Sequence, residues 1–289
     1  MQGPGLTLPR GFTLIEMVMV IALSGAVLAL VSTVLTRPME HYVDSARRAE
    51  LVDVAESALQ IMARDVRSAL PNSLRVSSGR ALEMVNVVAG ARYRAEPDGS
   101  GGGDPLDFAA PDGGFDVLGT LSVPPGGRLV IYNLGARDAG GNPLPGANVY
   151  AGPSPGPLPV AGSHVISPSG ATLSGGALVT INPPFQFALP SPQRRVYVVD
   201  QPISYLCEGG QIRRYTGYGL QPSQPVSGSL PPLSAASEAL LTQHVTGCSF
   251  TYDAGLSNQG RGLLTLSLTL SLGGESISLL HQVHVDNSP

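Results

Sequence analysis

A run of 20 uncharged, mostly apolar residues, Met17–Thr36, limits what this chain can fold into more than any other stretch. As a helix with a rise of about 1.5 Å per residue, the run would be about 30 Å long, which matches the hydrocarbon core of a bilayer. Glu16 lies at its edge. Because an ionised carboxylate in apolar surroundings is costly unless another group neutralises it, we expect a membrane-spanning helix whose carboxylate has a partner.

The residues in front of the run, Arg10–Glu16 (RGFTLIE), resemble the type IV prepilin leader of pilins and pseudopilins. This resemblance implies that a membrane peptidase cuts after Gly11 and that Phe12 becomes an N-methylated amino terminus. It also implies that Glu16 attracts the terminal amine of a neighbouring subunit in a filament. The alternative is an ordinary signal peptide or a plain membrane anchor. That alternative leaves Glu16 unexplained, and no small-residue cleavage site follows the apolar run.

Composition narrows the classes of function. All 17 basic residues are Arg, and the formal net charge is −4, or −5 once the leader with Arg10 is removed. A mildly acidic chain offers no basic stripe for a phosphate backbone, so nucleic-acid binding is disfavoured. The 289 residues are enough for an anchor and one sizeable domain or two small ones.

We expect an α+β fold in which a long N-terminal helix packs on a mainly antiparallel β domain. The first half of the helix would lie in the membrane, and Pro38 would kink or break it near Thr36–Met39. Apolar residues at helical spacing then predict a face that packs on the domain: Leu51, Val54, Ala55, Ala58, Met62, Val66 and Ala69. Arg64, Asp65 and Arg67 lie in the last turns of this helix and are interpreted as a solvated face, with a contact to a neighbouring subunit as the alternative. The expected parts are a leader (1–11), a transmembrane or filament-core helix (12–37), its amphipathic continuation (38–72) and an exported α+β globular domain (73–289).

The C-terminal third has the clearest strand patterns. Leucines alternate with Ser and Thr over 264–272, and Gly273-Gly274 then turns the chain into a second strand, which predicts a β-hairpin. Ser234–Gln243 reads as a short helix. Further expected strands are Ala81–Val88, Arg128–Asn133, Ala177–Asn182, Arg195–Asp200 and Gln211–Tyr215.

Two cysteines, Cys207 and Cys248, each share a predicted strand face with apolar neighbours. An even pair beyond a translocated membrane helix predicts a disulfide formed in an oxidising compartment. Two unpaired core thiols are the alternative.

No catalytic or metal-binding set stands out. There is no G-x-S-x-G, H-E-x-x-H, P-loop or C-x-x-C motif, so we expect neither an enzyme nor a cofactor. The Gly/Asp-rich segment 96–116 lacks the spacing of an EF-hand, which favours a solvated loop over a calcium site. His281 and His284 are three apart on a strand and point to opposite faces, which excludes a shared metal and predicts a hydrogen-bonded core histidine and a surface one.

Four further segments resemble the minor pilins of the MSHA pilus: 42–51, 62–73, 213–219 and 279–287. This resemblance implies a non-enzymatic minor pilin that starts or caps a filament. Its implied partners are a prepilin peptidase and methyltransferase, other minor and major pilins, an inner-membrane assembly platform and the inner membrane itself. The N-terminus would be cytoplasmic and the C-terminal domain periplasmic, with a possible place in the pilus at the cell surface. A minor pseudopilin of type II secretion and a tip adhesin remain alternatives.

Overall fold

The computed structural model describes residues 11–255 and 260–289, with the backbone alone described over 33–41. The chain divides into two compact units, one that ends at Glu50 and one that runs from Leu51 to Pro289. The leader, apart from Gly11, lies outside the described residues.

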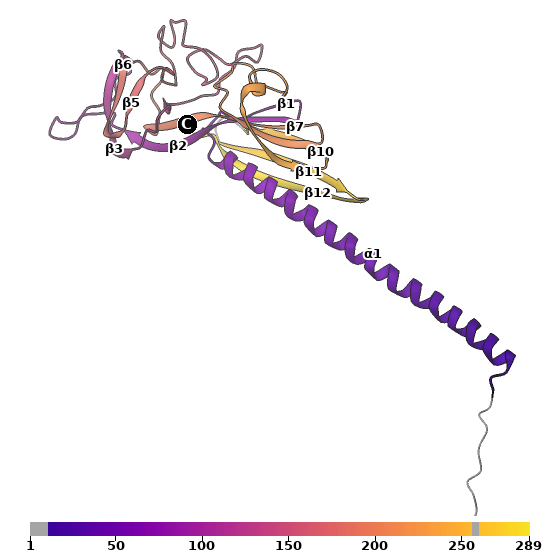
Figure 1. The fold of residues 1–289 in the computed structure, drawn as a ribbon. Coiled ribbons are helices and arrows are strands. Elements are labelled where there is room, and N and C mark those ends of the chain that lie inside the picture. Colours follow the sequence, from indigo (N-terminus) through magenta and orange to yellow (C-terminus); the bar gives the residue numbers. More distant parts are fainter. Residues whose placement is uncertain (1–10, 256–259) are drawn as a thin grey trace, which may run out of the picture. The chain divides into compact units, whose positions relative to one another are not determined.

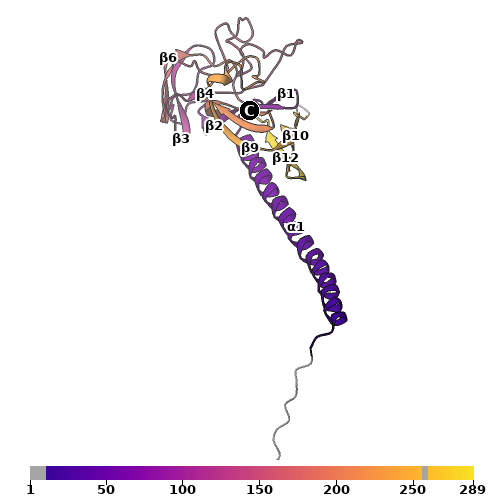
Figure 2. The ribbon, with the colours of Figure 1, turned by 45° about the vertical axis from the view of Figure 1, so that its right-hand side comes forward.

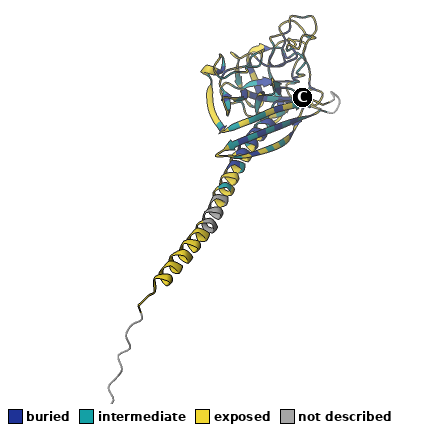
Figure 3. Cartoon of the chain, turned by 90° about the vertical axis from the view of Figure 1, so that its right-hand side faces the viewer, coloured by how far each residue is buried: buried dark blue, intermediate teal, exposed yellow. Residues whose placement is uncertain are grey.

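The 54-residue helix α1 (Leu14–Arg67) is the only α-helix in the described part of the chain. Its segment Leu14–Ser32 is long and apolar enough to cross a membrane, with a mean hydropathy of 2.5. Every described side chain over 11–32 is exposed (Figure 3). The backbone remains helical through Pro38, so of the expected kink or break near Thr36–Met39 the break is wrong. A proline removes one helical hydrogen bond, and the bonds on either side can carry the helix past it.

The helix ends before the expected boundary at Asn72. The amide of Leu70 donates to the carbonyl of Val85 (2.8 Å) instead of continuing the helix, and Pro71 follows directly. The chain therefore leaves α1 by joining the sheet at β2. Sheet pairing ends this helix earlier than its own sequence pattern would.

All strands pair antiparallel, in two sheets (Figure 1). The larger has nine strands with β5-β6-β3-β2-β7-β8-β9 as its main order, and the smaller has the order β10-β11-β12. Figure 2 shows the smaller sheet from a second direction. The strands are β1 (Arg75–Ser77), β2 (Ala81–Tyr93), β3 (Asp112–Leu121), β4 (Arg128–Val130), β5 (Thr172–Ser174), β6 (Gly176–Phe185), β7 (Arg195–Glu208), β8 (Gln211–Thr216), β9 (Ser237–Gln243), β10 (Val245–Asp253), β11 (Arg261–Leu272) and β12 (Glu275–Asp286).

The predicted hairpin is confirmed. Leu272 pairs with Glu275 across Gly273-Gly274, whose φ angles of 60° and 90° suit glycine in a tight hairpin turn. Leu264, Leu266, Leu268 and Leu270 are buried, which fixes the register of β11 because a slip by one residue would expose them all.

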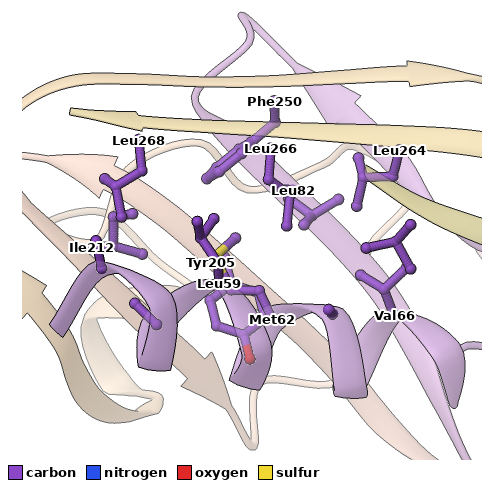
Figure 4. Packing of buried hydrophobic residues seen from close by; sticks show 14 of the residues in the cluster. Leu59, Met62, Val66, Leu82, Tyr205, Ile212, Phe250, Leu264, Leu266 and Leu268 are labelled. Carbon is purple, nitrogen blue, oxygen red and sulfur yellow. The ribbon is translucent and has the colours of Figure 1, made fainter. Parts of the chain in front are cut away.

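The main core lies between the second half of α1, the middle of the large sheet and the inner face of the small sheet (Figure 4). From α1 it takes Leu59, Met62 and Val66, which face Leu82, Tyr205 and the β11 leucines. Val54 is 41% exposed and lies outside this core, so its predicted inward position is wrong. The other six predicted positions are buried or packed against the core. A second apolar cluster, around Phe115 and Phe187, fills the far part of the large sheet.

The predicted helix over Ser234–Gln243 is wrong. A 3-10 turn at Leu233–Ala235 leads into β9, which pairs with β8 along its whole length. The side chains of Ser237–Leu240 are exposed, so no apolar face would have held a helix against the domain. The free edge of β8 offers backbone hydrogen bonds that outweigh the helix propensity of Ala, Glu and Leu.

Candidate functional site

The first turn of α1 is built by Thr13 and Glu16. The Glu16 amide donates to the Thr13 carbonyl (3.1 Å) and lies 3.4 Å from the Thr13 hydroxyl oxygen, and the Met17 amide also donates to that carbonyl (3.2 Å). Thr-x-x-Glu is the capping-box pattern, in which the first side chain satisfies amides that have no helical partner. The sequence thus starts the helix immediately after Phe12.

Gly11 and Phe12 precede the helix and are exposed, Phe12 by 82%. A Cβ added at Gly11 would meet nothing within 4 Å in this chain. The peptide bond between these residues is therefore non-helical and accessible, as a bond cut by a peptidase must be. Arg10, the first residue of the leader motif, lies outside the described residues.

Glu16 is the one charged residue between Gly11 and Thr36. It lies at the positive end of the helix dipole, which favours a carboxylate there. The residues that surround it along α1 are apolar and cannot neutralise it. A counter-charge must come from outside α1 when this segment is covered by apolar material.

The second half of α1 is fixed to the domain through Asp65. The Tyr205 hydroxyl and the Arg214 Nε donate to the same carboxylate oxygen, at 2.7 and 2.8 Å. Burial and the hydrogen bond to Asp65 raise the pKa of Tyr205 far above its usual value. Asp65 is thus an internal anchor between α1, β7 and β8, and its reading as part of a solvated face is wrong. Arg64 and Arg67 are exposed, as that reading predicted.

A buried ion pair, which the sequence did not predict, joins β1 to β2. Arg75 Nε contacts Glu83, and the two side chains are 5% and 0% exposed. The Tyr218 hydroxyl donates to Glu83 (2.9 Å), and Arg75 donates to the carbonyls of Gln221 and Pro222 at 2.7 and 2.8 Å. Burial raises the pKa of Glu83, although Arg75 opposes this shift. The members come from three segments, β1, β2 and the stretch 218–222, and Tyr218 lies 135 residues from Glu83, so no local spacing could reveal the whole network.

Cys207 in β7 and Cys248 in β10 lie in different sheets and pack against the main core. The two thiols are unbonded but interact as hydrogen-bond partners. The hydrogen bond with Cys248 lowers the pKa of Cys207; burial opposes this shift and Arg80 favours it. The same contact raises the pKa of Cys248. The disulfide stays a prediction, and the interaction between the two thiols is consistent with it.

The histidines and the acidic loop show no metal site. Within the described ranges, no group of three potential ligands is placed to hold a metal ion. His284 is exposed as predicted, whereas the buried Nε2 of His281 has no hydrogen-bond partner, so the predicted hydrogen-bonded histidine is wrong. In the Asp-rich loop, Asp98 accepts from the amides of Ser100 and Gly102, at 2.9 and 2.7 Å. This carboxylate closes its own turn.

Comparison with known proteins gives one match. Residues 9–32 match the family model of the prokaryotic N-terminal methylation motif, which covers Gly11, Phe12 and Glu16. No curated protein and no solved structure matches the chain. The motif implies processing by a prepilin peptidase. Together with the apolar segment Leu14–Ser32, it indicates a pilin-like protein anchored in the inner membrane.

Proposed function

Starting from a prepilin-type N-terminal methylation motif on a pilin-like α+β layout, we propose that this protein is a minor pilin that helps to initiate or cap a type IV pilus of the MSHA kind. Proteins with this motif are typically non-enzymatic and structural. The observation that carries the proposal is the match over residues 9–32, in which an accessible Gly11–Phe12 bond directly precedes α1.

In this proposal, a prepilin peptidase removes residues 1–11 and Phe12 becomes the N-methylated terminus. The segment from Phe12 then anchors the chain in the inner membrane, with the N-terminus cytoplasmic and the domain periplasmic. Its partners are the peptidase and methyltransferase, other minor and major pilins, and the assembly platform. Glu16 pairs with the terminal amine of an adjacent subunit.

The minor-pilin role is supported by the resemblance to MshO, the MSHA-pilus biogenesis protein, outside the leader. The resembling segments 42–51 and 62–73 lie in or just after α1, 213–219 begins in β8 and 279–287 lies mostly in β12. These elements build the main core, where Ile212, Met62 and Val283 are buried. The segment between β2 and β7 carries little of the resemblance. We therefore propose that the part of the chain built from α1, β8 and β12 supplies the assembly function.

Deletion of the gene tests the proposal. We expect a loss of surface filaments in the shear fraction, restored by the wild-type chain at a level far below that of the major pilin. Filaments that form in normal number without this chain would contradict the proposal. A filament-independent defect in protein secretion would identify the chain as a minor pseudopilin instead. Normal filaments that no longer attach to surfaces after deletion of the Gly/Pro-rich loops would identify a tip adhesin.

A further inference from the structure

A groove of about 550 Å³ runs between the exposed side of α1 and the start of the resembling segment in β12. From the helix it is lined by residues that recur every three or four positions, and from β12 by one histidine. All of them belong to the unit that begins at Leu51. The lining of the groove includes Gln60, Arg64 and Arg67 from the helix and His281 from β12.

The groove carries positive charge on an otherwise acidic chain. Arg64 and Arg67 are exposed and one turn apart, and among the described residues neither forms an ion pair. Their neighbour Asp65 points to Arg214 and Tyr205 and does not neutralise them. Gln60, which lines the groove, donates a hydrogen bond to the Glu56 carboxylate (2.9 Å). Two guanidinium groups are thus free to bind an anion.

His281 adds a second, independent observation. His281 lines the same groove, and its buried Nε2 has no hydrogen-bond partner among the described residues. An unpartnered buried polar atom is uncommon and costs free energy, which a ligand would recover by supplying the missing bond. A ring nitrogen and two forked guanidinium groups in one groove suit carboxylates, since Arg binds them through two parallel hydrogen bonds.

We propose that this groove binds an acidic segment of the neighbouring pilin-like subunit in the filament, with its carboxylates on Arg64 and Arg67 and one hydrogen bond to His281. This inference rests on the proposed function, because it assigns the contact to a filament neighbour. Charge pairs at an exposed interface fix orientation and partner choice more than affinity. The apolar segment Leu14–Ser32 supplies the affinity between subunits, and the groove sets how one domain seats against the next.

A binding measurement on the detergent-solubilised full chain tests the groove directly. The probe is a hexa-aspartate peptide. We expect wild type to bind it and the double variant Arg64→Gln/Arg67→Gln to bind at least tenfold more weakly. The control Arg137→Gln/Arg194→Gln removes the same charge from exposed arginines elsewhere and should bind as wild type does. Equal weakening in both variants, or no binding by wild type, overturns the proposal.

A cross-linking experiment in cells tests the partner. A benzophenone amino acid at Gln60 should cross-link to a protein that itself carries the prepilin methylation motif, and Arg64→Glu/Arg67→Glu should abolish this product. A product that survives the charge reversal, or a partner without the motif, overturns the proposal. If the chain enters filaments but gives no product, the groove is wrong and the proposed function stands. If it never enters filaments, the proposed function itself fails.

Discussion

Glu16 combines a local role with an intermolecular one. Its amide bonds to Thr13 at the start of α1, where the helix dipole favours a carboxylate. A capping role alone would be satisfied by Gln as well, because either side chain completes a capping box. A charge-pairing role requires the carboxylate itself. These two roles can therefore be separated by substitution.

Glu16→Ala and Glu16→Gln should both leave membrane insertion and leader cleavage intact, because removal of a charge eases insertion. Both should reduce co-purification with other pilins from membranes, because the amine of the adjacent subunit would be left buried and unpaired. A Gln variant that assembles like wild type while Ala fails would show that Glu16 acts only as a capping residue. If both variants assemble normally, Glu16 has no role in assembly.

Loss of the buried ion pair Arg75–Glu83 should reduce the stability of the domain strongly. Arg75→Met leaves a buried carboxylate without its cation and should lower the free energy of unfolding by about 3–5 kcal/mol at pH 7. Arg194→Met, in the exposed pair with Glu96, is the matched control and should cost less than about 1 kcal/mol. Denaturant titration of the solubilised chain measures both.

The same pair predicts a pH dependence. Burial raises the pKa of Glu83 above its ordinary 4.5, so the folded state holds this proton more tightly than the unfolded state. The stabilisation from this group is fully present below pH 4.5 and is lost as the pH rises through the raised value. Arg75→Met should therefore be less harmful at pH 4 than at pH 7, and Arg75→Met/Glu83→Gln should lose this difference. A cost that is the same at both pH values would contradict the account.

At the scale of elements, the hairpin β11–β12 could be predicted because five leucines alternate strictly and two glycines mark the turn. The end of α1 and the edge strand β9 could not be predicted from the sequence. Their local sequences favour helix, and the deciding hydrogen bonds come from partners far away in the chain, at Val85 and along β8. The anchor at Asp65 was unpredictable for the same reason, because Tyr205 and Arg214 lie 140 and 149 residues further along the chain. The ion pair Arg75–Glu83 is local, eight residues apart across the paired strands β1 and β2, and was missed because β1 itself was not predicted. Leader residues needed no tertiary partner, which is why their motif could be read directly.

The disulfide belongs to this scale because it would connect two sheets. A Cys207–Cys248 bond would close a loop of about 40 residues and should stabilise the oxidised domain by about 3–4 kcal/mol. Unfolding of the exported protein with and without reductant measures this difference. The variant Cys207→Ser/Cys248→Ser should be indifferent to reductant. Two alkylatable thiols in the exported protein would rule the bond out.

At the scale of the whole molecule, the exposed apolar segment Leu14–Ser32 determines where the protein can be stable. Leu14–Ser32 has no buried residue in the isolated chain, and an apolar surface of that length in water would drive association. Either a bilayer or a bundle of similar helices must cover it. The domain from Leu51 onward has its own buried cores, so it can fold outside the membrane while α1 remains anchored.

The central claim is that this chain is a prepilin-type precursor, and the mature N-terminus tests it most directly. Intact mass and N-terminal sequencing of the membrane-extracted protein should show a chain that starts at Phe12 and carries one methyl group. Gly11→Val should accumulate uncut precursor, because a side chain would crowd the close backbone approach that glycine permits. A wild-type protein that retains Met1, or a mature chain that starts at any residue other than Phe12, would contradict the account.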